Sequence, residues 1–160
     1  MSLPWQRAAL TGILATLLFS LFLQLTGIFR LPNMNLALWN GTLVTLNLGA
    51  ATVVGYVLEF AIGIGLTLLY VRVSPHIKGS ALRKGLWYGL GLWMALMVIG
   101  LPLFGWVSPL VRDGLMMSPG FFAAHMGIAA TITWLLALEI YSLSVSYLVS
   151  AKTFRLPTHS

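Results

Sequence analysis

The sequence predicts an all-α, polytopic membrane protein whose four transmembrane helices form two hairpins. Hydrophobic residues make up 59% of the 160 residues, charged residues make up only 8%, and the mean hydropathy is +0.93. A soluble domain has about 25% charged residues, so this chain lacks the polar side chains that a water-facing surface requires. The apolar residues also fall into four long runs. We therefore expect lipid to cover most of the protein.

The first apolar run, residues 8–29, contains no charged side chain. At about 1.5 Å per residue it spans the ~30 Å hydrocarbon core of a bilayer. The run is longer than the apolar core of a cleavable signal peptide, so we expect a retained helix. Gly12, Thr16 and Ser20 recur every four positions, which places three small side chains in one row where a second helix can pack closely.

Residues 33–50 predict a short interfacial or re-entrant helix after the first span. Pro32 breaks the preceding helix, and several asparagines make the following segment half polar. The segment is too polar to cross a membrane, yet its leucines are too numerous for a free loop. Trp39 is expected to anchor it at the level of the lipid headgroups.

Three further spans are expected at residues 51–73, 85–107 and 119–150. Pro102 is expected to bend the third span near its far end. The fourth span would be about 48 Å long, so it would have to tilt strongly or project from the membrane. All four spans belong to one transmembrane domain that comprises residues 1–160.

The basic segment 72–84 predicts the orientation. The expected topology places this segment and both termini on one side of the membrane, and only Arg30 and Arg112 of the nine Lys and Arg residues fall on the other side. The positive-inside rule then predicts that both termini are cytoplasmic and that the protein lies in the bacterial inner (cytoplasmic) membrane. Four cations of the segment are expected to contact anionic phospholipid headgroups: Arg72, Lys78, Arg83 and Lys84. Nucleic acid is not an expected partner.

Glu59 and His125 are predicted to form an intramembrane polar pair. Glu59 lies about 20 Å from the inner boundary by helix rise, and His125 lies about 9 Å below the outer edge, so the two could meet at similar depth. A carboxylate in lipid is costly unless it is protonated or paired, and His125 is the obvious partner. Such a pair could fix helix packing through a hydrogen bond, handle protons, contact a metal or hydrogen-bond a quinone.

Glu139, Ser142 and Ser146 predict a polar stripe on the fourth helix. The stripe could line a water-filled path, or it could form an interface with headgroups or a neighbouring subunit. Four further small residues are expected at close helix contacts: Gly63, Gly85, Gly89 and Gly127.

Several chemistries are excluded by what the sequence lacks. Cysteine is absent, which excludes disulfides and thiolate metal sites. One intramembrane histidine cannot supply the two axial ligands of a bis-histidine haem within one chain. HExxH, P-loop and GxSxG motifs are also absent. We therefore expect no metal, no cofactor and no catalytic residue, and the protein is not predicted to be an enzyme.

Two blocks, GLWYGLGLWMALMVIGLPLFGW and FFAAHMGIAATITWLLALEIYS, resemble a class of small, uncharacterised bacterial four-helix integral membrane proteins. In that class a histidine near the start of an even-numbered helix is followed by a Gly-rich turn. His125 and Gly127 match this pattern in helix four. In helix two the corresponding positions hold Glu59 and Gly63, so a paired-histidine site is not implied. The resemblance implies the four-helix fold and no established activity.

Two functions from different classes follow from these features. The first is a non-catalytic accessory or structural subunit of a larger membrane complex, in respiratory or photosynthetic electron transfer, with other membrane-protein subunits as partners and a quinone as a candidate ligand. The second is a small proton-coupled carrier or channel that uses Glu59, His125 and Glu139. Four helices leave little room for an alternating-access cavity in a monomer, which favours the subunit.

Overall fold

The computed structural model describes residues 5–29 and 35–151. Within these ranges the chain is helical and forms no strand. Four helical segments are long and apolar enough to cross a membrane, namely Trp5–Phe29, Leu48–His76, Ala81–Val107 and Ile128–Ser150. This arrangement confirms the predicted all-α class, with four helical segments of the length and composition that a membrane span requires.

Several of these segments combine different types of helix. The first comprises α1 (Trp5–Leu25) and the 3-10 turn η1 (Thr26–Phe29), and the second comprises α3 (Leu48–Val73) and the 3-10 turn η2 (Ser74–His76). The third comprises α4 (Ala81–Ala95), the π-helical turn η3 (Leu96–Gly100) and α5 (Leu101–Val107). The fourth is α7 (Ile128–Ser150), and the shorter elements are α2 (Leu36–Thr42), α6 (Pro109–Arg112) and the 3-10 turn η4 (Phe121–Ala123).

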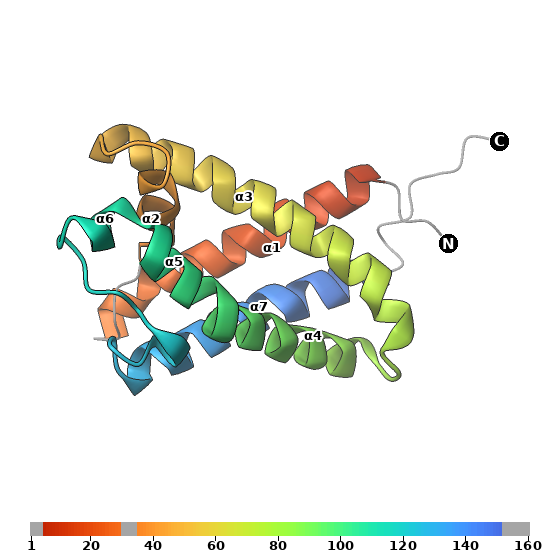
Figure 1. Ribbon diagram of the computed structural model, residues 1–160. Coiled ribbons are helices and arrows are strands. Elements are labelled where there is room, and N and C mark those ends of the chain that lie inside the picture. Colours follow the sequence, from red (N-terminus) through yellow and green to blue (C-terminus); the bar gives the residue numbers. More distant parts are fainter. Residues whose placement is uncertain (1–4, 30–34, 152–160) are drawn as a thin grey trace.

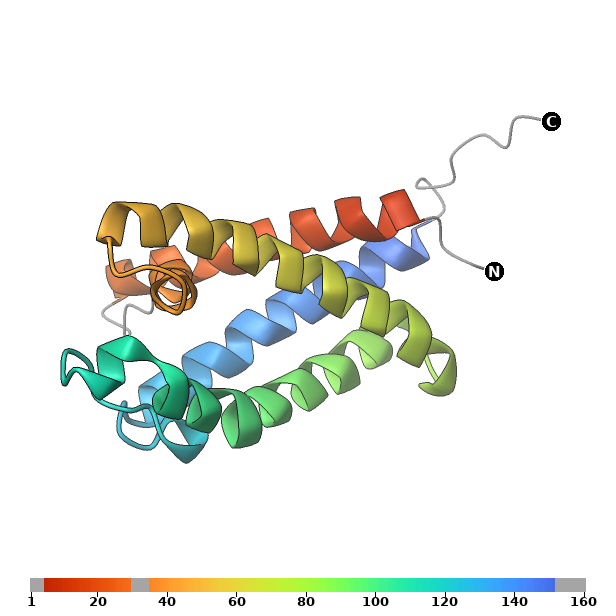
Figure 2. The same ribbon diagram turned by 45° about the horizontal axis from the view of Figure 1, so that its top comes forward.

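The long helices pack as two pairs, α1 with α3 and α4 with α7, and α1 also packs against α7 (Figure 1). The connection between α3 and α4 lies at one end of the bundle, together with the start of α1 and the end of α7 (Figure 2). We call this end the loop end. The opposite end carries α2, α5 and α6, and we call it the α2 end. This arrangement matches the two hairpins that the sequence predicts.

The row of small residues on α1 packs against α3 as predicted. A Cβ atom added at Gly12 would lie 2.8 Å from the Cα atom of Ile64, and one added at Gly63 would overlap the hydroxyl of Thr16. Distances this short leave no space for larger side chains. The two backbones therefore approach as closely as small-residue faces allow in membrane helix pairs.

The predicted glycine face of α4 meets α7 in the same way. A Cβ atom at Gly85 would lie 2.9 Å from the Leu143 side chain, and one at Gly89 would lie 2.7 Å from the Glu139 carboxyl. Both glycines are buried. Their packing roles are therefore confirmed, and the Glu139 side chain lies against α4.

The short helix predicted after the first span is α2, which lies across the bundle end against the start of α3 (Figure 2). Asparagine side chains begin both helices: Asn35 accepts a hydrogen bond from the Leu38 amide at 3.0 Å, and Asn47 accepts one from the Ala50 amide at 3.1 Å. These N-caps satisfy amides that have no partner within the helix. Pro32 and Asn33, which the prediction also used, lie outside the described residues.

Two glycines allow α2 to touch α3. A Cβ atom at Gly41 would overlap the backbone carbonyl of Ala51, and one at Gly55 would overlap the carbonyl of Ala37. The overlap involves backbone atoms, which cannot move aside as a side-chain tip can. Each helix thus supplies one glycine to the contact, and α2 is held directly on α3.

The predicted limits of the fourth span, residues 119–150, are wrong. Helix α7 begins at Ile128, because the backbone before it leaves the helical region: φ is 70° at Gly120 and 86° at Gly127. Positive φ favours glycine and interrupts a helix. The span therefore has 23 residues, about 35 Å by helix rise, and needs no unusual tilt.

The packing role predicted for Gly127 is also wrong. A Cβ atom added there would meet nothing within 4 Å. The residue is the N-cap of α7 with φ 86° and ψ 164°, a conformation that only glycine adopts readily. Its function is to turn the chain into the helix.

Pro102 perturbs the third span as predicted. The five residues before α5, Leu96–Gly100, form a π-helical turn. Proline lacks an amide hydrogen and its ring crowds the preceding turn, so the regular α-helical hydrogen bonds cannot continue through it. Beyond this turn Phe104 stacks on Trp39 of α2, with ring centroids 5.5 Å apart.

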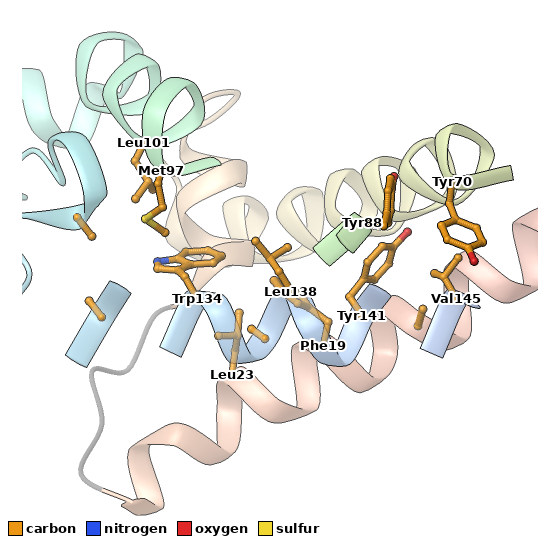
Figure 3. Close-up of a cluster of buried hydrophobic side chains, with 14 residues drawn as sticks. Phe19, Leu23, Tyr70, Tyr88, Met97, Leu101, Trp134, Leu138, Tyr141 and Val145 are labelled. Carbon is orange, nitrogen blue, oxygen red and sulfur yellow. The ribbon is translucent and has the colours of Figure 1, made fainter. Parts of the chain in front are cut away.

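A cluster of buried side chains fills the centre of the bundle (Figure 3). Trp134, Leu138 and Tyr141 of α7 form one side of it, and Phe19 of α1 packs on Trp134 with ring centroids 6.3 Å apart. Met97 lies on the opposite side of the Trp134 ring in this view. The cluster leaves a mainly apolar space beside it.

Candidate ligand-binding site

A cavity of about 400 Å³ lies among α1, α3, η3 and α7. Its walls are mainly aliphatic and aromatic side chains, including Phe19, Ile62, Leu92, Ile99 and Trp134. The volume falls in the range of about 300–1,000 Å³ that is typical of small-molecule sites, and such sites are usually apolar with a few polar groups.

The cavity opens at the bundle surface between α3 and η3. Ile62 and Ile99 line it from these two elements and are 52% and 58% exposed, whereas Trp134 at its inner wall is 1% exposed. Closer to the loop end the Tyr88 hydroxyl of α4 donates a 2.6 Å hydrogen bond to the Leu66 carbonyl of α3. The two helices are thus joined near the loop end, and in a bilayer the opening would face lipid.

Glu59 is the acidic group of this cavity. Its side chain is 5% exposed, and Oε1 accepts a hydrogen bond from the Ser20 hydroxyl of α1. A glutamate at this position is costly to bury without several hydrogen bonds, and Ser20 supplies one. The carboxyl therefore retains hydrogen-bonding capacity toward whatever enters the cavity.

Two further polar groups at the cavity have no protein partner. Trp134 Nε1 and Thr16 Oγ1 are both buried, and neither makes a hydrogen bond. A buried polar group without a partner costs about 1–3 kcal/mol. Both residues line the cavity with other atoms, because these two polar atoms are themselves inaccessible, so Glu59 supplies the carboxyl of a mainly apolar wall.

A second, smaller cavity of about 210 Å³ lies toward the α2 end. Its walls are more polar and include Gln24, Asn35, Tyr56 and Glu59. The Gln24 amide donates a 2.9 Å hydrogen bond to the Tyr56 hydroxyl, which ties α1 to α3 at this point. Glu59 therefore belongs to both cavities, which we call the apolar cavity and the polar cavity.

The structure does not bring the predicted pair of Glu59 and His125 together. His125 is exposed on the connection before α7, and its Nδ1 donates a 2.8 Å hydrogen bond to the Ser118 carbonyl. Glu59 bonds Ser20 instead. The prediction relied on a continuous helix from residue 119, and that helix does not form.

The predicted polar stripe on α7 lies within helix contacts. The Ser146 hydroxyl donates to the Ala81 carbonyl at 2.6 Å and contacts the Tyr70 hydroxyl at 2.7 Å. Ser142 is fully buried, and its hydroxyl and Oε2 of Glu139 have no hydrogen-bond partner. Glu139 and the two serines line neither the apolar nor the polar cavity.

The cations predicted to contact lipid headgroups lie at the loop end. Arg72, Lys78 and Arg83 are exposed and Lys84 is half-buried. Lys78 and Arg83 border a shallow surface depression with Trp87. A cation beside an interfacial tryptophan suits a membrane surface, and contact with anionic phospholipids stays a prediction.

Sequence reasoning missed the aromatic and amide groups of the two cavities. Trp134 lies in the second turn of α7, inside the span, whereas tryptophans of membrane helices concentrate at the two interfaces. That unusual depth was a usable signal. Gln24 and Tyr56 carried no signal of their own, because their pairing depends on how α1 and α3 pack.

The described residues offer no ready-made metal site, since no group of three or more His, Asp or Glu side chains comes together in residues 5–29 and 35–151. The chain matches no protein-family model, no curated protein and no solved structure. The resemblance to small four-helix bacterial membrane proteins therefore stays a prediction. The function must be argued from the geometry of the chain itself.

Proposed function

We propose that this protein binds a lipid-soluble molecule with a polar head in the apolar cavity. The observation that carries the proposal is the cavity itself, which is open at the bundle surface and bears Glu59 on mainly apolar walls. A molecule dissolved in the bilayer can reach such an opening sideways. Its polar head can hydrogen-bond the Glu59 carboxyl, while its apolar body contacts the leucines and isoleucines.

An isoprenoid quinone is the ligand class that fits best. A quinone carbonyl oxygen accepts hydrogen bonds, which complements a protonated Glu59. The planar ring suits walls built from Phe19 and Leu92, and a long apolar tail can leave between α3 and η3 into lipid. A free fatty acid fits less well, because its carboxylate would face the carboxyl of Glu59.

The chain itself shows no catalytic constellation in its described part, so we propose a non-catalytic role. The protein would act as an accessory subunit of a respiratory or photosynthetic membrane complex and hold a quinone for it, with other membrane-protein subunits as partners. The bacterial inner membrane, with both termini cytoplasmic, is the proposed location. The α2 end would then lie on the outer side.

The alternative of a proton-coupled carrier receives no support from the arrangement of its three residues. Glu59 lies at the apolar and polar cavities, His125 lies on an exposed connection, and Glu139 lies against α4. A carrier that uses all three would need them along one path.

The proposal is tested by extracting the molecules that co-purify with the protein in mild detergent and identifying them by mass spectrometry. Leu92→Trp fills the apolar cavity, and Leu86→Trp places the same ring on the exposed face of α4 as a matched control. We expect a quinone with the wild type and with Leu86→Trp, and its loss from Leu92→Trp. Equal quinone content in all three proteins would contradict the proposal.

The subunit role has its own test. Native-gel migration after mild detergent extraction separates large complexes from small oligomers. We expect the protein to migrate with a large redox complex. Migration only as a small homo-oligomer would contradict the accessory role and leave quinone binding to be judged by the extraction experiment.

A further inference from the structure

Glu59 separates two cavities of opposite character. On one side lies the apolar cavity, which opens between α3 and η3, and on the other lies the polar cavity toward the α2 end. Gln24 and Asn35 line the polar cavity and are both exposed. The polar cavity therefore begins at exposed polar side chains and ends at a buried carboxyl.

The lining of the polar cavity suits water. It offers the amide groups of Gln24 and Asn35, the hydroxyls of Ser20 and Tyr56, and the carboxyl of Glu59. A cavity holds water when it is polar and has at least one probe-sized volume of ~10–15 Å³, and about 210 Å³ is ample. The apolar cavity lacks such partners over most of its wall, so water entering from the α2 end would stop near Glu59.

We infer that the polar cavity is a water path from the α2 end to Glu59, so that this carboxyl exchanges protons with the aqueous side while it faces the apolar cavity. Water would deliver a proton to a free oxygen of the carboxylate, and the carboxylic acid would then donate a hydrogen bond to an oxygen of the bound head. The reverse steps would return the proton to water. No electron moves in either direction.

No other ionisable group with a charge at neutral pH faces Glu59 among the residues that the structure describes. Helix α1 presents Ser20 and Gln24, α2 presents Asn35, and α3 itself adds Tyr56 one turn earlier. Asn40 of α2 and Tyr141 of α7 also line the apolar cavity, while η3 contributes only apolar side chains and glycine. Proton exchange in this part of the bundle is therefore assigned to Glu59 alone.

Only the identity of the ligand rests on the proposed function, so the water path is tested without ligand. The protein is reconstituted in vesicles and treated with a water-soluble carbodiimide plus an amine, which modifies carboxyls that water reaches, or with a lipid-soluble carbodiimide, which arrives through the bilayer. Peptide mass spectrometry then measures modification at Glu59. Exposed Asp113 reports exposure of the α2 end, and an impermeant amine reagent at Lys78 reports the loop end.

Two substitutions close the two cavities separately. Gln24→Trp fills the polar cavity, and Leu25→Trp is its control on an exposed position that does not line the cavity. Leu92→Trp fills the apolar cavity, and Leu86→Trp is its control. Both controls carry the same ring in the same helix, which separates blockage from a general effect of tryptophan.

We expect the water-soluble reagent to modify Glu59 only in molecules whose α2 end, as reported by modification of Asp113, is accessible to that reagent. Gln24→Trp should lower that modification at least fivefold and leave modification by the lipid-soluble reagent unchanged. Leu92→Trp should have the opposite pattern, and Leu25→Trp and Leu86→Trp should match the wild type.

The inference is overturned if the water-soluble reagent fails to modify Glu59, if it does so equally in Gln24→Trp, or if it enters only from the side of Lys78. Failure of the proposed function looks different. In that case the expected labelling pattern is observed, but no quinone is found in the extraction experiment. The water path is then supported and quinone binding is not.

Discussion

The two halves of the bundle differ in how their buried polar groups are hydrogen-bonded. In the half toward the loop end, hydroxyls bridge the helices: Tyr70 bonds Ser146, Tyr141 bonds Thr67 at 2.9 Å, and Tyr88 bonds the Leu66 carbonyl. In the half toward the α2 end the helices enclose the apolar and polar cavities, and Trp134 and Thr16 have no partner.

The difference indicates which half holds the fold and which half can hold a ligand. Interhelical hydrogen bonds and close glycine contacts fix the half toward the loop end. Most buried hydroxyls there already have a partner, although the Ser142 hydroxyl and Oε2 of Glu139 do not. In the other half Trp134 and Thr16 line the apolar cavity and Ser108 lies apart from it, and each holds a buried polar atom without a protein partner, which costs stability.

The largest expected effect comes from removing the attachment of α2. Gly55→Leu would drive a side chain into the backbone of Ala37, and we expect it to displace α2 and destabilise the protein by about 3 kcal/mol. Gly65→Leu is the control on the same helix, since nothing lies within 4 Å of its Cβ position. Thermal unfolding in detergent measures both, and an unchanged Gly55→Leu midpoint would show that α2 is not held on α3.

A smaller effect is expected where the chain turns into α7. Gly127→Ala should cost about 2 kcal/mol, because φ 86° with ψ 164° is accessible almost only to glycine. Gly91→Ala serves as the control, since this exposed glycine lies inside α4 and has free space around it. Alanine there should raise stability by about 0.5–1 kcal/mol. Equal shifts in unfolding midpoint for the two variants would argue that α7 begins earlier than Ile128.

The sharpest comparison uses one hydrogen-bonding group from each half. Tyr70→Phe removes the contact with Ser146 and should lower stability by about 1 kcal/mol without changing quinone binding. Trp134→Phe removes an indole N–H that bonds nothing in the protein, and the smaller ring should still cover most of the same space. We expect it to weaken quinone binding several-fold, because the smaller ring presents less surface to the ligand in the apolar cavity. Titration with quinone and thermal unfolding are measured on the same samples. Loss of quinone binding in Tyr70→Phe and not in Trp134→Phe would contradict the comparison.

Much of the fold could be predicted from the sequence because it depends on local chemistry. The length of the apolar runs predicts the spans, and the spacing of Gly12 and Thr16 predicts a packing face. Pro102 predicts the break in the third span. The start of the fourth helix could not be predicted in this way. Glycine at 120 and 127 is compatible with a membrane helix, and only the tertiary path shows that both positions have positive φ.

The candidate site was predicted only in part. Glu59 is easily recognised as the one acid in its apolar run, but its hydrogen-bond partner depends on which helices face each other. The sequence suggested His125 from depth alone, whereas Ser20 lies on the neighbouring helix and bonds the carboxyl. The polar cavity lies among α1, α2 and α3, and the apolar cavity needs all four spans and α2, so no local pattern reveals either one.

The most direct test of the central claim compares the two intramembrane acids. Purified protein in lipid nanodiscs is titrated with a short-tailed benzoquinone, and binding is followed by quenching of the Trp134 fluorescence, obtained as the difference from Trp134→Phe. Glu59 lines the apolar cavity and Glu139 does not. We predict that Glu59→Gln weakens binding about tenfold, which is ~1.4 kcal/mol, and that Glu139→Gln binds as the wild type does. Equal affinities for the three proteins, or a loss confined to Glu139→Gln, would contradict a ligand site at Glu59.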